Sequence, residues 1–163
     1  MSKNQIIAFS KNQTEQEPQA VHAETMQLLG SLMASSDLIA VALDSFFQTH
    51  GLSYARWQVL MLLAKNGNKG RPSFIAEKQN VSRATMTGLI IGLEKDGFVT
   101  RDPCVKDGRQ ICVTLTAKAK QAVKDLTPLY QKQACSILSG LSDDEAKSLQ
   151  QILSKIILDN ISN

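Results

Sequence analysis

The sequence contains few residues of the kinds that build reactive centres. Its 163 residues include three cysteines and two histidines, and no group of Cys, His and acidic residues has the spacing of a metal site. It has no glycine-rich phosphate loop, no G-x-S-x-G elbow, and no Cys–His or paired-carboxylate arrangement with a plausible scaffold. The sequence therefore predicts a protein that is not an enzyme and that needs neither a metal nor a cofactor.

Long apolar runs are also missing. No unbroken run approaches the roughly 18 residues needed to span a bilayer, and the apolar stretch at residues 6–9 is too short for a secretory signal. Three cysteines, an odd number without paired spacing, agree with a reducing compartment. We therefore expect a cytoplasmic protein without a membrane partner. Its length suits one domain, or a dimerising domain with a subdomain, and its 43% apolar residues exclude wholesale disorder.

Positive charge is concentrated in one segment. Residues 65–124 hold twelve Lys and Arg against five Asp and Glu, a net charge of +7, whereas the rest of the chain carries −4. Such a bias is expected of a surface that binds phosphates. Composition alone can also produce it, so the charge supports a nucleic-acid partner without deciding the matter.

The same segment reads as a helix-turn-helix. Pro72 and Ser73 open a short helix that reaches residue 79, and Ser82 is expected to cap the helix that follows. In that second helix Met86, Leu89, Ile90 and Leu93 form one apolar stripe at helical spacing. The N-terminal end carries small or hydrogen-bonding side chains and one long cation, which suits a helix that enters a DNA major groove. We predict that this end contacts double-stranded DNA through Ser82, Arg83, Ala84, Thr85, Thr87 and Gly88.

A basic hairpin is predicted directly after the helix pair. The runs 99–102 and 111–115 are rich in β-branched residues, and Ile111, Val113 and Leu115 alternate as one buried face would. Asp107-Gly108 is a strong turn pair between them. A charged tip is ordinary for a solvated hairpin, but after a helix-turn-helix it favours a DNA-binding wing that reaches the minor groove. We add Arg71, Lys106, Asp107 and Arg109 to the predicted DNA contacts, with Asp107 orienting a neighbouring cation.

The terminal segments are expected to form helices that bury their apolar faces against a second copy of the chain. A polar arm is predicted over residues 1–20, followed by an N-terminal dimerisation helix over 21–52. The winged helix-turn-helix domain is expected over 53–116, and the C-terminal dimerisation helices over 117–163, the first capped by Thr116 and the second opened by the box Ser142–Glu145. The predicted fold is mainly α (α+β).

The order of elements and several motifs resemble the multiple-antibiotic-resistance regulator (MarR) family of winged-helix transcription factors. The similar motifs are Leu52-Ser53 with Trp57, Val81-Ser82 with Thr85 and Thr87, Gly97-Phe98-Val99-x-Arg101, and Asp107-x-Arg109 with Val113-x-Leu115-Thr116. The resemblance covers roughly residues 25–160. It implies a homodimeric transcriptional regulator with its first, fifth and sixth helices in the dimer interface. It also implies control by small phenolic ligands, by metals or by cysteine oxidation.

Further sites and functions remain open on the sequence alone. Arg56 is a candidate to neutralise an acidic small molecule, with Trp57 beside it, although Trp57 is more typical of a core residue. Among the cysteines, Cys104 is the best candidate for redox sensing, because nearby cations such as Arg101 favour the reactive thiolate. The alternatives to a ligand-controlled repressor are a cysteine-based redox regulator and a winged-helix module that binds protein instead of DNA.

Overall fold

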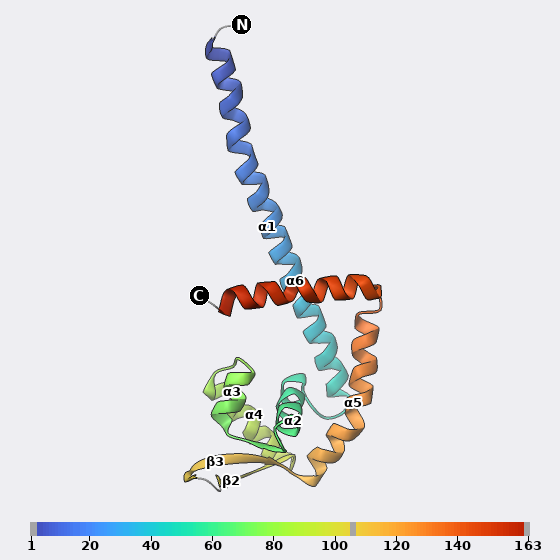
Figure 1. Ribbon diagram of the computed structural model, residues 1–163. Coiled ribbons are helices and arrows are strands. Elements are labelled where there is room, and N and C mark those ends of the chain that lie inside the picture. Colours follow the sequence, from blue (N-terminus) through green and yellow to red (C-terminus); the bar gives the residue numbers. More distant parts are fainter. Residues whose placement is uncertain (1–2, 105–106, 162–163) are drawn as a thin grey trace. The chain divides into compact units, whose positions relative to one another are not determined.

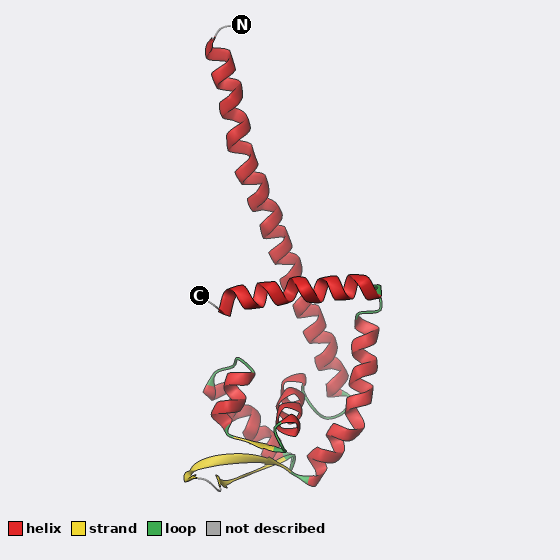
Figure 2. Cartoon of the chain, viewed as in Figure 1, coloured by secondary structure: helices red, strands yellow, loops and turns green. Residues whose placement is uncertain are grey.

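The computed structural model describes the backbone of residues 3–104 and 107–161, and the side chains of residues 22–104 and 110–156. Its elements, labelled in Figure 1, are α1 (Lys3–Gln48), α2 (Tyr54–Lys65), β1 (Lys69–Gly70), α3 (Pro72–Lys78), α4 (Arg83–Lys95), β2 (Val99–Cys104), β3 (Asp107–Leu115), α5 (Ala117–Ile137) and α6 (Asp143–Ile161). Among the described residues helices predominate, and the strands form one small sheet (Figure 2). This agrees with the predicted fold class. The chain divides into two compact units, residues 1–42 and 43–163.

The first unit holds most of α1. This helix begins at Lys3, whereas the sequence predicted a polar arm up to residue 20 and a helix from residue 21. The polar residues of the predicted arm are mainly Gln, Lys, Glu and Asn. Gln, Lys and Glu have a high helix propensity, so a polar composition alone does not mark the start of a helix.

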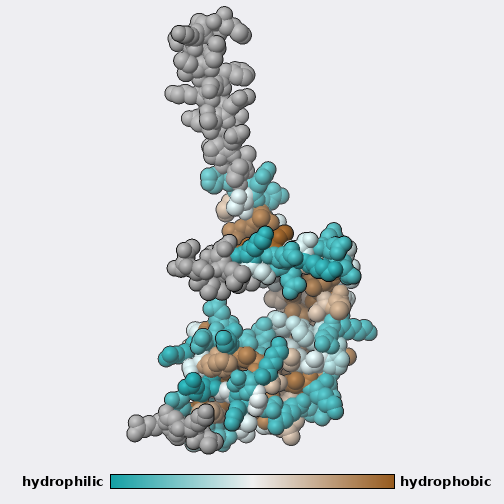
Figure 3. All heavy atoms as spheres, in the orientation of Figure 1, coloured by the Kyte–Doolittle hydropathy of each residue, from teal (hydrophilic) through white to brown (hydrophobic). Residues whose placement is uncertain are grey.

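Residues His22–Gln48 of α1 are long and apolar enough, by length and composition alone, to cross a membrane, and very little of this stretch is buried. The sequence prediction considered only unbroken apolar runs, none of which approaches this length, so it did not identify this stretch. Serines interrupt the run, but Ser31 and Ser35 donate their hydroxyls to the carbonyl oxygens of Gln27 and Ser31, at 2.9 and 2.7 Å. These bonds satisfy the hydroxyls within the helix. An apolar surface results, and Figure 3 shows it on α1.

The second unit is built on α2, α3 and α4, whose starts follow the sequence signals. Ser53 caps α2 by accepting a hydrogen bond from the Arg56 backbone N–H at 3.3 Å, and Ser82 caps α4 by accepting one from Thr85 at 3.0 Å. Proline stands at the start of α3, where its missing N–H costs nothing. The apolar stripe predicted for α4 is confirmed, with three members buried and one half-buried, namely Met86, Ile90, Leu93 and Leu89.

The sheet has the antiparallel order β1-β3-β2. Both hairpin strands are longer than predicted, and β3 begins at Asp107, so Asp107 and Gly108 lie in a strand and not in the predicted turn. The strand β1 was not predicted, because two residues are too few to show an alternating pattern. Val113 and Leu115 are buried as predicted, but Ile111 is 46% exposed. The prediction for Ile111 was wrong because the outer end of the hairpin extends beyond the core.

The core lies between α2, α3, α4, the sheet and the first half of α5. Its largest fully buried side chains include Trp57, Phe47, Leu60 and Leu63. The Phe47 and Trp57 rings stack with centroids 4.9 Å apart, and Tyr130 of α5 packs 6.0 Å from the Trp57 ring. Burial of these side chains stabilises the unit by roughly 1.5–3 kcal/mol for each large apolar residue.

The last two helices begin at the predicted caps. Thr116 accepts a hydrogen bond from the Ala119 N–H at 3.2 Å and donates its hydroxyl to the Gly97 carbonyl at 2.8 Å, which ties the start of α5 to the turn between α4 and β2. Ser142 donates its N–H to the Glu145 carboxylate at 2.9 Å, and this capping box precedes α6. Hydrogen bonds from the Ser142 hydroxyl and backbone hold the pKa of Glu145 below its usual value.

Candidate nucleic-acid interface

The first turns of α4 present a surface of small and hydrogen-bonding side chains. All six residues predicted there are exposed, namely Ser82, Arg83, Ala84, Thr85, Thr87 and Gly88. The Ser82 and Thr85 hydroxyls lie 2.8 Å apart, and the Thr87 hydroxyl donates to the Arg83 carbonyl at 2.8 Å. Thr87 is exposed, and its hydroxyl oxygen can still accept a hydrogen bond. Beside it Gly88 has open space where a side chain would stand, so another molecule can approach the backbone closely.

A depression of about 430 Å³ lies between α4, the start of α3 and strand β3. Its lining brings together three predicted residues, Arg71, Arg83 and Thr87, with Pro72, Ser73, Gln110 and Ile111. Arg71 stands directly before α3 and donates from Nη1 to the Gln110 Oε1 at 2.8 Å. Two cations in the walls of an open depression suit the binding of phosphate oxygens.

Ser73, Gln110 and Ile111 were missed by the sequence analysis. Gln110 and Ile111 follow the predicted wing cation Arg109, and Ile111 was assigned to the buried face. These residues are identified by their position in the structure. They lie where the outer part of β3 approaches the start of α3, and the Arg71–Gln110 hydrogen bond joins the two elements. Side-chain type alone does not mark Gln or Ser as a contact residue.

Each strand of the wing carries one arginine, and the tip of the wing is only partly described. Arg101 of β2 pairs with Glu94 of α4 at 2.5 Å, and this hydrogen-bonded carboxylate raises the pKa of the arginine. Arg101 thus links the hairpin to α4. Asp107 and Arg109 lie in β3, but their side chains fall outside the described residues, as does the whole of Lys106. The predicted orienting role of Asp107 stays a prediction.

The two residues proposed for a small molecule have different environments. Arg56 forms an ion pair with Asp96, the residue that ends α4, with Nη1 and Oδ2 at 2.7 Å. Its guanidinium crosses α4 at Gly92, where a side chain would collide with it. Trp57 is 1% exposed and belongs to the core. Arg56 is therefore committed to holding α2 against α4, and Trp57 is mainly structural.

The cysteines depart from the sequence prediction. Cys104 and Cys112 form a disulfide, with an S–S distance of 2.02 Å and Cα atoms 5.0 Å apart. The prediction of cysteines without paired spacing was wrong, because an eight-residue separation becomes a short distance when two strands fold back on each other. Cys104 is therefore not a free thiolate next to Arg101 in this structure. The remaining cysteine, Cys135, is free and exposed on α5.

Comparisons with known proteins agree with this geometry. The model of the MarR family matches residues 52–111, which span α2 to the outer part of β3. The HTH-type transcriptional repressor YetL of Bacillus subtilis is 31% identical over 135 residues, covering 82% of this chain and 80% of YetL. The chain belongs to the MarR family.

Solved structures show the same fold in other MarR-like regulators. Sco3205, a MarR-family regulator from Streptomyces coelicolor solved in complex with DNA, has a TM-score of 0.78 at 22% identity, and the match covers 86% of this chain and 89% of Sco3205. The organohalide-sensing regulator RdhR, solved with 2,4-dichlorophenol bound, has a TM-score of 0.73 at 16% identity, over 79% of this chain and 76% of RdhR. Membership of the MarR family makes the chain a DNA-binding transcriptional regulator and not an enzyme.

Proposed function

We propose that this MarR-family regulator binds a two-fold symmetric operator as a homodimer and represses transcription. The N-terminal end of α4 enters the major groove, and the hairpin follows the adjacent minor groove. The observation that carries this proposal is the exposed, small and polar start of α4 beside the depression that contains Arg71 and Arg83. Repression is supported by the similarity to the YetL repressor. An in vitro transcription assay in which the added protein increases transcription from its target promoter would contradict repression.

A second copy of the chain is the proposed partner of the terminal helices. Within α1, the apolar side chains of Met26, Leu28, Met33 and Leu38 are each more than 60% exposed. α6 exposes a stripe of its own, which includes Ile152 at 54%. Exposed apolar stripes of this extent mark partner surfaces. Each chain has one DNA-recognition helix, α4, so a two-fold symmetric operator is matched only when two chains combine. The match of α1 to a membrane-spanning length is the competing explanation, and retention of the protein by lipid vesicles would support it.

The DNA contact is tested by the salt dependence of binding. Arg83→Ala and Arg109→Ala each remove two cations from a dimer, so each should weaken binding to duplex DNA and flatten the salt slope by about two units where the lost contact is ionic. Lys132→Ala, an exposed cation on α5, is the matched control and should change neither quantity. If all three variants bind with the affinity and slope of the wild type, the face bound by DNA lies elsewhere. Complete absence of salt-dependent DNA binding would instead favour a protein-interaction module.

A small aromatic effector is proposed to bind at the aromatic end of the core. A hollow of about 250 Å³ is lined by residues of α2 and α5 together with Gln79, and its walls include Tyr54, Trp57, Met61 and Tyr130. The walls are partly apolar and also carry two phenolic hydroxyls and the polar Gln58 and Lys65, and this mixture suits a substituted phenol, the class of ligand bound by RdhR. Trp57 is the single tryptophan, so a dichlorophenol bound there should change the intrinsic fluorescence. Binding without a fluorescence change would place the effector elsewhere.

We also propose that the protein is located in the cytoplasm, because a transcriptional regulator must reach DNA.

A further inference from the structure

Helix α4 is held at its last turn by polar contacts from three other elements. Arg56 of α2 pairs with Asp96 at 2.7 Å, and Lys118 of α5 donates from its ammonium to the Asp96 carbonyl oxygen at 2.6 Å. Arg101 of β2 pairs with Glu94, which lies two residues before Asp96. These contacts gather at the end of the helix opposite to the proposed DNA surface.

We infer that Arg56, Gly92, Asp96 and Lys118, which we call the α4 joint, position the recognition helix and thereby determine how strongly the regulator distinguishes one DNA sequence from another. None of the four is among the residues expected to touch DNA. They are positioning residues, because they act through the orientation of α4. The inference rests on the proposed contact between the start of α4 and the major groove.

Asp96 is an unfavourable residue for the end of a helix unless it has partners. The carbonyl groups of the last turn carry partial negative charge, so an acidic side chain there is repelled. The Arg56 guanidinium offsets this repulsion, and Lys118 satisfies the Asp96 carbonyl oxygen and adds a cation at the C-terminus of α4. The Lys118 ammonium also lies 4.4 Å from the centre of the Phe98 ring. The place of Asp96 is therefore explained by its partners and not by the helix itself.

Gly92 makes room for the guanidinium of Arg56. A side-chain carbon at position 92 would overlap with the Arg56 Nη2 atom and lie 2.9 Å from its Cζ atom. Inside a helix glycine is less favourable than alanine, because it loses more backbone freedom. Gly92 stands one turn before Asp96, on the same face of α4. The missing side chain thus lets the guanidinium cross the helix and reach the Asp96 carboxylate.

A small rotation at this joint is amplified at the other end of the helix. α4 has 13 residues, so its two ends are about 20 Å apart. A tilt of about 10° at the last turn would move the start of the helix by roughly 3 Å, the length of a hydrogen bond. Burial of Met86, Ile90 and Leu93 holds α4 on the core, but apolar burial is not directional. The directional bonds of the joint therefore fix where Thr87 and its neighbours meet the base edges.

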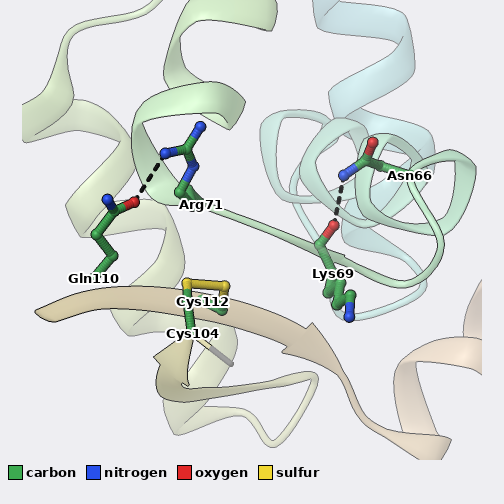
Figure 4. The surroundings of a disulfide bond; sticks show 6 residues. All are labelled: Asn66, Lys69, Arg71, Cys104, Gln110 and Cys112. Atoms are coloured by element: carbon green, nitrogen blue, oxygen red, sulfur yellow. Dashed lines mark hydrogen bonds between the residues drawn. A yellow bond between two sulfur atoms is a disulfide. The ribbon is translucent and has the colours of Figure 1, made fainter. Parts of the chain in front are cut away.

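Stability alone does not account for the joint. The Arg56 and Asp96 side chains are 29% and 40% exposed, and ion pairs with this much solvent contact add little to folding stability. The neighbouring elements have a polar contact of their own, since Figure 4 shows the hydrogen bond from Arg71, directly before α3, to Gln110 of β3. Loss of the α4 joint should therefore leave the fold intact and change DNA recognition.

Gly92→Ala is the main test, because it displaces the guanidinium without changing any charge. The wild type first selects duplexes from a randomised pool. Fluorescence anisotropy then measures the affinity of each variant for a selected duplex and for a scrambled duplex, and the ratio of the two affinities is the selectivity. We expect the selectivity to fall roughly tenfold in Gly92→Ala, which corresponds to the loss of about one base contact. Affinity for the scrambled duplex and the salt slope should stay near those of the wild type.

Arg56→Ala and Asp96→Asn test the same joint with opposite changes of charge. Both should lower the selectivity, although the first removes a cation and the second removes an anion. Once the Arg56 side chain is gone, a methyl group at position 92 has no guanidinium to displace. Gly92→Ala should therefore cause no further loss of selectivity in the Arg56→Ala background, and it should raise the melting temperature there because alanine favours the helix.

Lys118→Met tests the contact from α5. It removes the hydrogen bond to the Asp96 carbonyl and should lower the selectivity in the same direction as Gly92→Ala. Lys120→Met makes the same substitution at an exposed position of the same helix and is the matched control, which should keep the selectivity of the wild type. Circular dichroism at the assay temperature reports whether each variant is folded.

The possible outcomes separate this inference from the proposed function. Wild-type selectivity in Gly92→Ala overturns the inference and leaves the DNA-binding function intact. Unfolding of Gly92→Ala also overturns it, because the joint is then required for the fold. Equal losses of affinity on both duplexes with a flatter salt slope in Arg56→Ala would make Arg56 a phosphate contact and not a positioning residue. A wild type that selects no sequence contradicts the proposed function, and the inference falls with it.

Discussion

Buried and exposed apolar side chains occupy different regions of this chain. Among the described residues, every buried apolar side chain lies between Leu43 and Leu126, from the end of α1 to the middle of α5. Most of the large exposed ones lie in residues 26–41 and 129–156. The first region buries its apolar surface within one chain, whereas the second, as we propose, buries its surface against a second copy of the chain. The comparison separates the part that forms the core from the part that is proposed to assemble.

Both regions contain apolar stripes at helical spacing, but one stripe is buried and the other is exposed. In α4 the stripe residues Met86, Ile90 and Leu93 are at most 2% exposed. In α6, Ile152 and Ile156 belong to a stripe of the same spacing but are 54% and 43% exposed. Helical periodicity therefore predicts that a face is apolar but does not say what covers it. The cover comes from neighbouring elements in the first case and, as we propose, from a second copy in the other.

The largest expected effect comes from opening a cavity in the first region. Leu60→Ala removes a fully buried side chain and should lower the free energy of unfolding by about 2–5 kcal/mol. Ile91→Ala, on α4 at 48% exposure, is the matched control and should cost less than about 1 kcal/mol. Urea denaturation followed by circular dichroism measures both. Equal losses of unfolding free energy in the two variants would contradict the distinction between buried and exposed apolar side chains.

A charge on the α6 stripe should act on assembly instead. Ile152→Asp would bury two carboxylates in a dimer interface, so we expect the dimer dissociation constant to rise about tenfold to hundredfold. Helix content should be retained, since the side chain is more than half exposed in the single chain. Gln151→Asp places the same charge on the neighbouring position, which is exposed and polar, and serves as control. Sedimentation equilibrium distinguishes them, and an unchanged dimer in Ile152→Asp would remove α6 from the interface.

The sequence was most informative where a local signal decides the structure. The caps Ser82 and Thr116 lie within hydrogen-bonding distance of the helix N–H groups that they were expected to satisfy, because a cap depends on residues only three positions apart. The exposed end of α4 was likewise predictable, since its polar residues and its stripe lie on one helix. The match to the MarR family confirms the resemblance drawn from these motifs.

The sequence was least informative where distant residues meet. The partnership of Cys104 with Cys112 depends on the hairpin register and on the shift at Pro103. The contact of Arg71 with Gln110 spans 39 positions, and that of Arg56 with Asp96 spans 40. No spacing rule reports such pairs. The strand β1 was missed for the same reason, because Lys69 and Gly70 become a strand only through their pairing with β3.

The smallest expected effect lies at the boundary of the two regions, at the half-buried Tyr54. Burial raises the pKa of Tyr54 to about 12, and the nearby hydroxyl of Tyr130, whose ring lies 6.4 Å away, adds to the rise. An unfolded tyrosine ionises near pH 10, so its neutral form contributes stability to the folded state that is fully present below about pH 10. This contribution is lost as the pH rises toward about 12.

Two variants isolate this contribution. Tyr54→Phe cannot ionise, so its stability should fall less steeply than that of the wild type between about pH 10 and 12 in urea denaturation. The chain has two tyrosines, so Tyr130→Phe leaves Tyr54 as the single phenol in an absorbance titration at the phenolate band. Its midpoint should lie above the ordinary value of about 10 but below that of Tyr54 in the wild type, because the Tyr130 hydroxyl is gone while burial remains. A midpoint near 10 would mean that water reaches Tyr54 freely, and that the raised pKa in the wild type comes from the Tyr130 hydroxyl and not from burial.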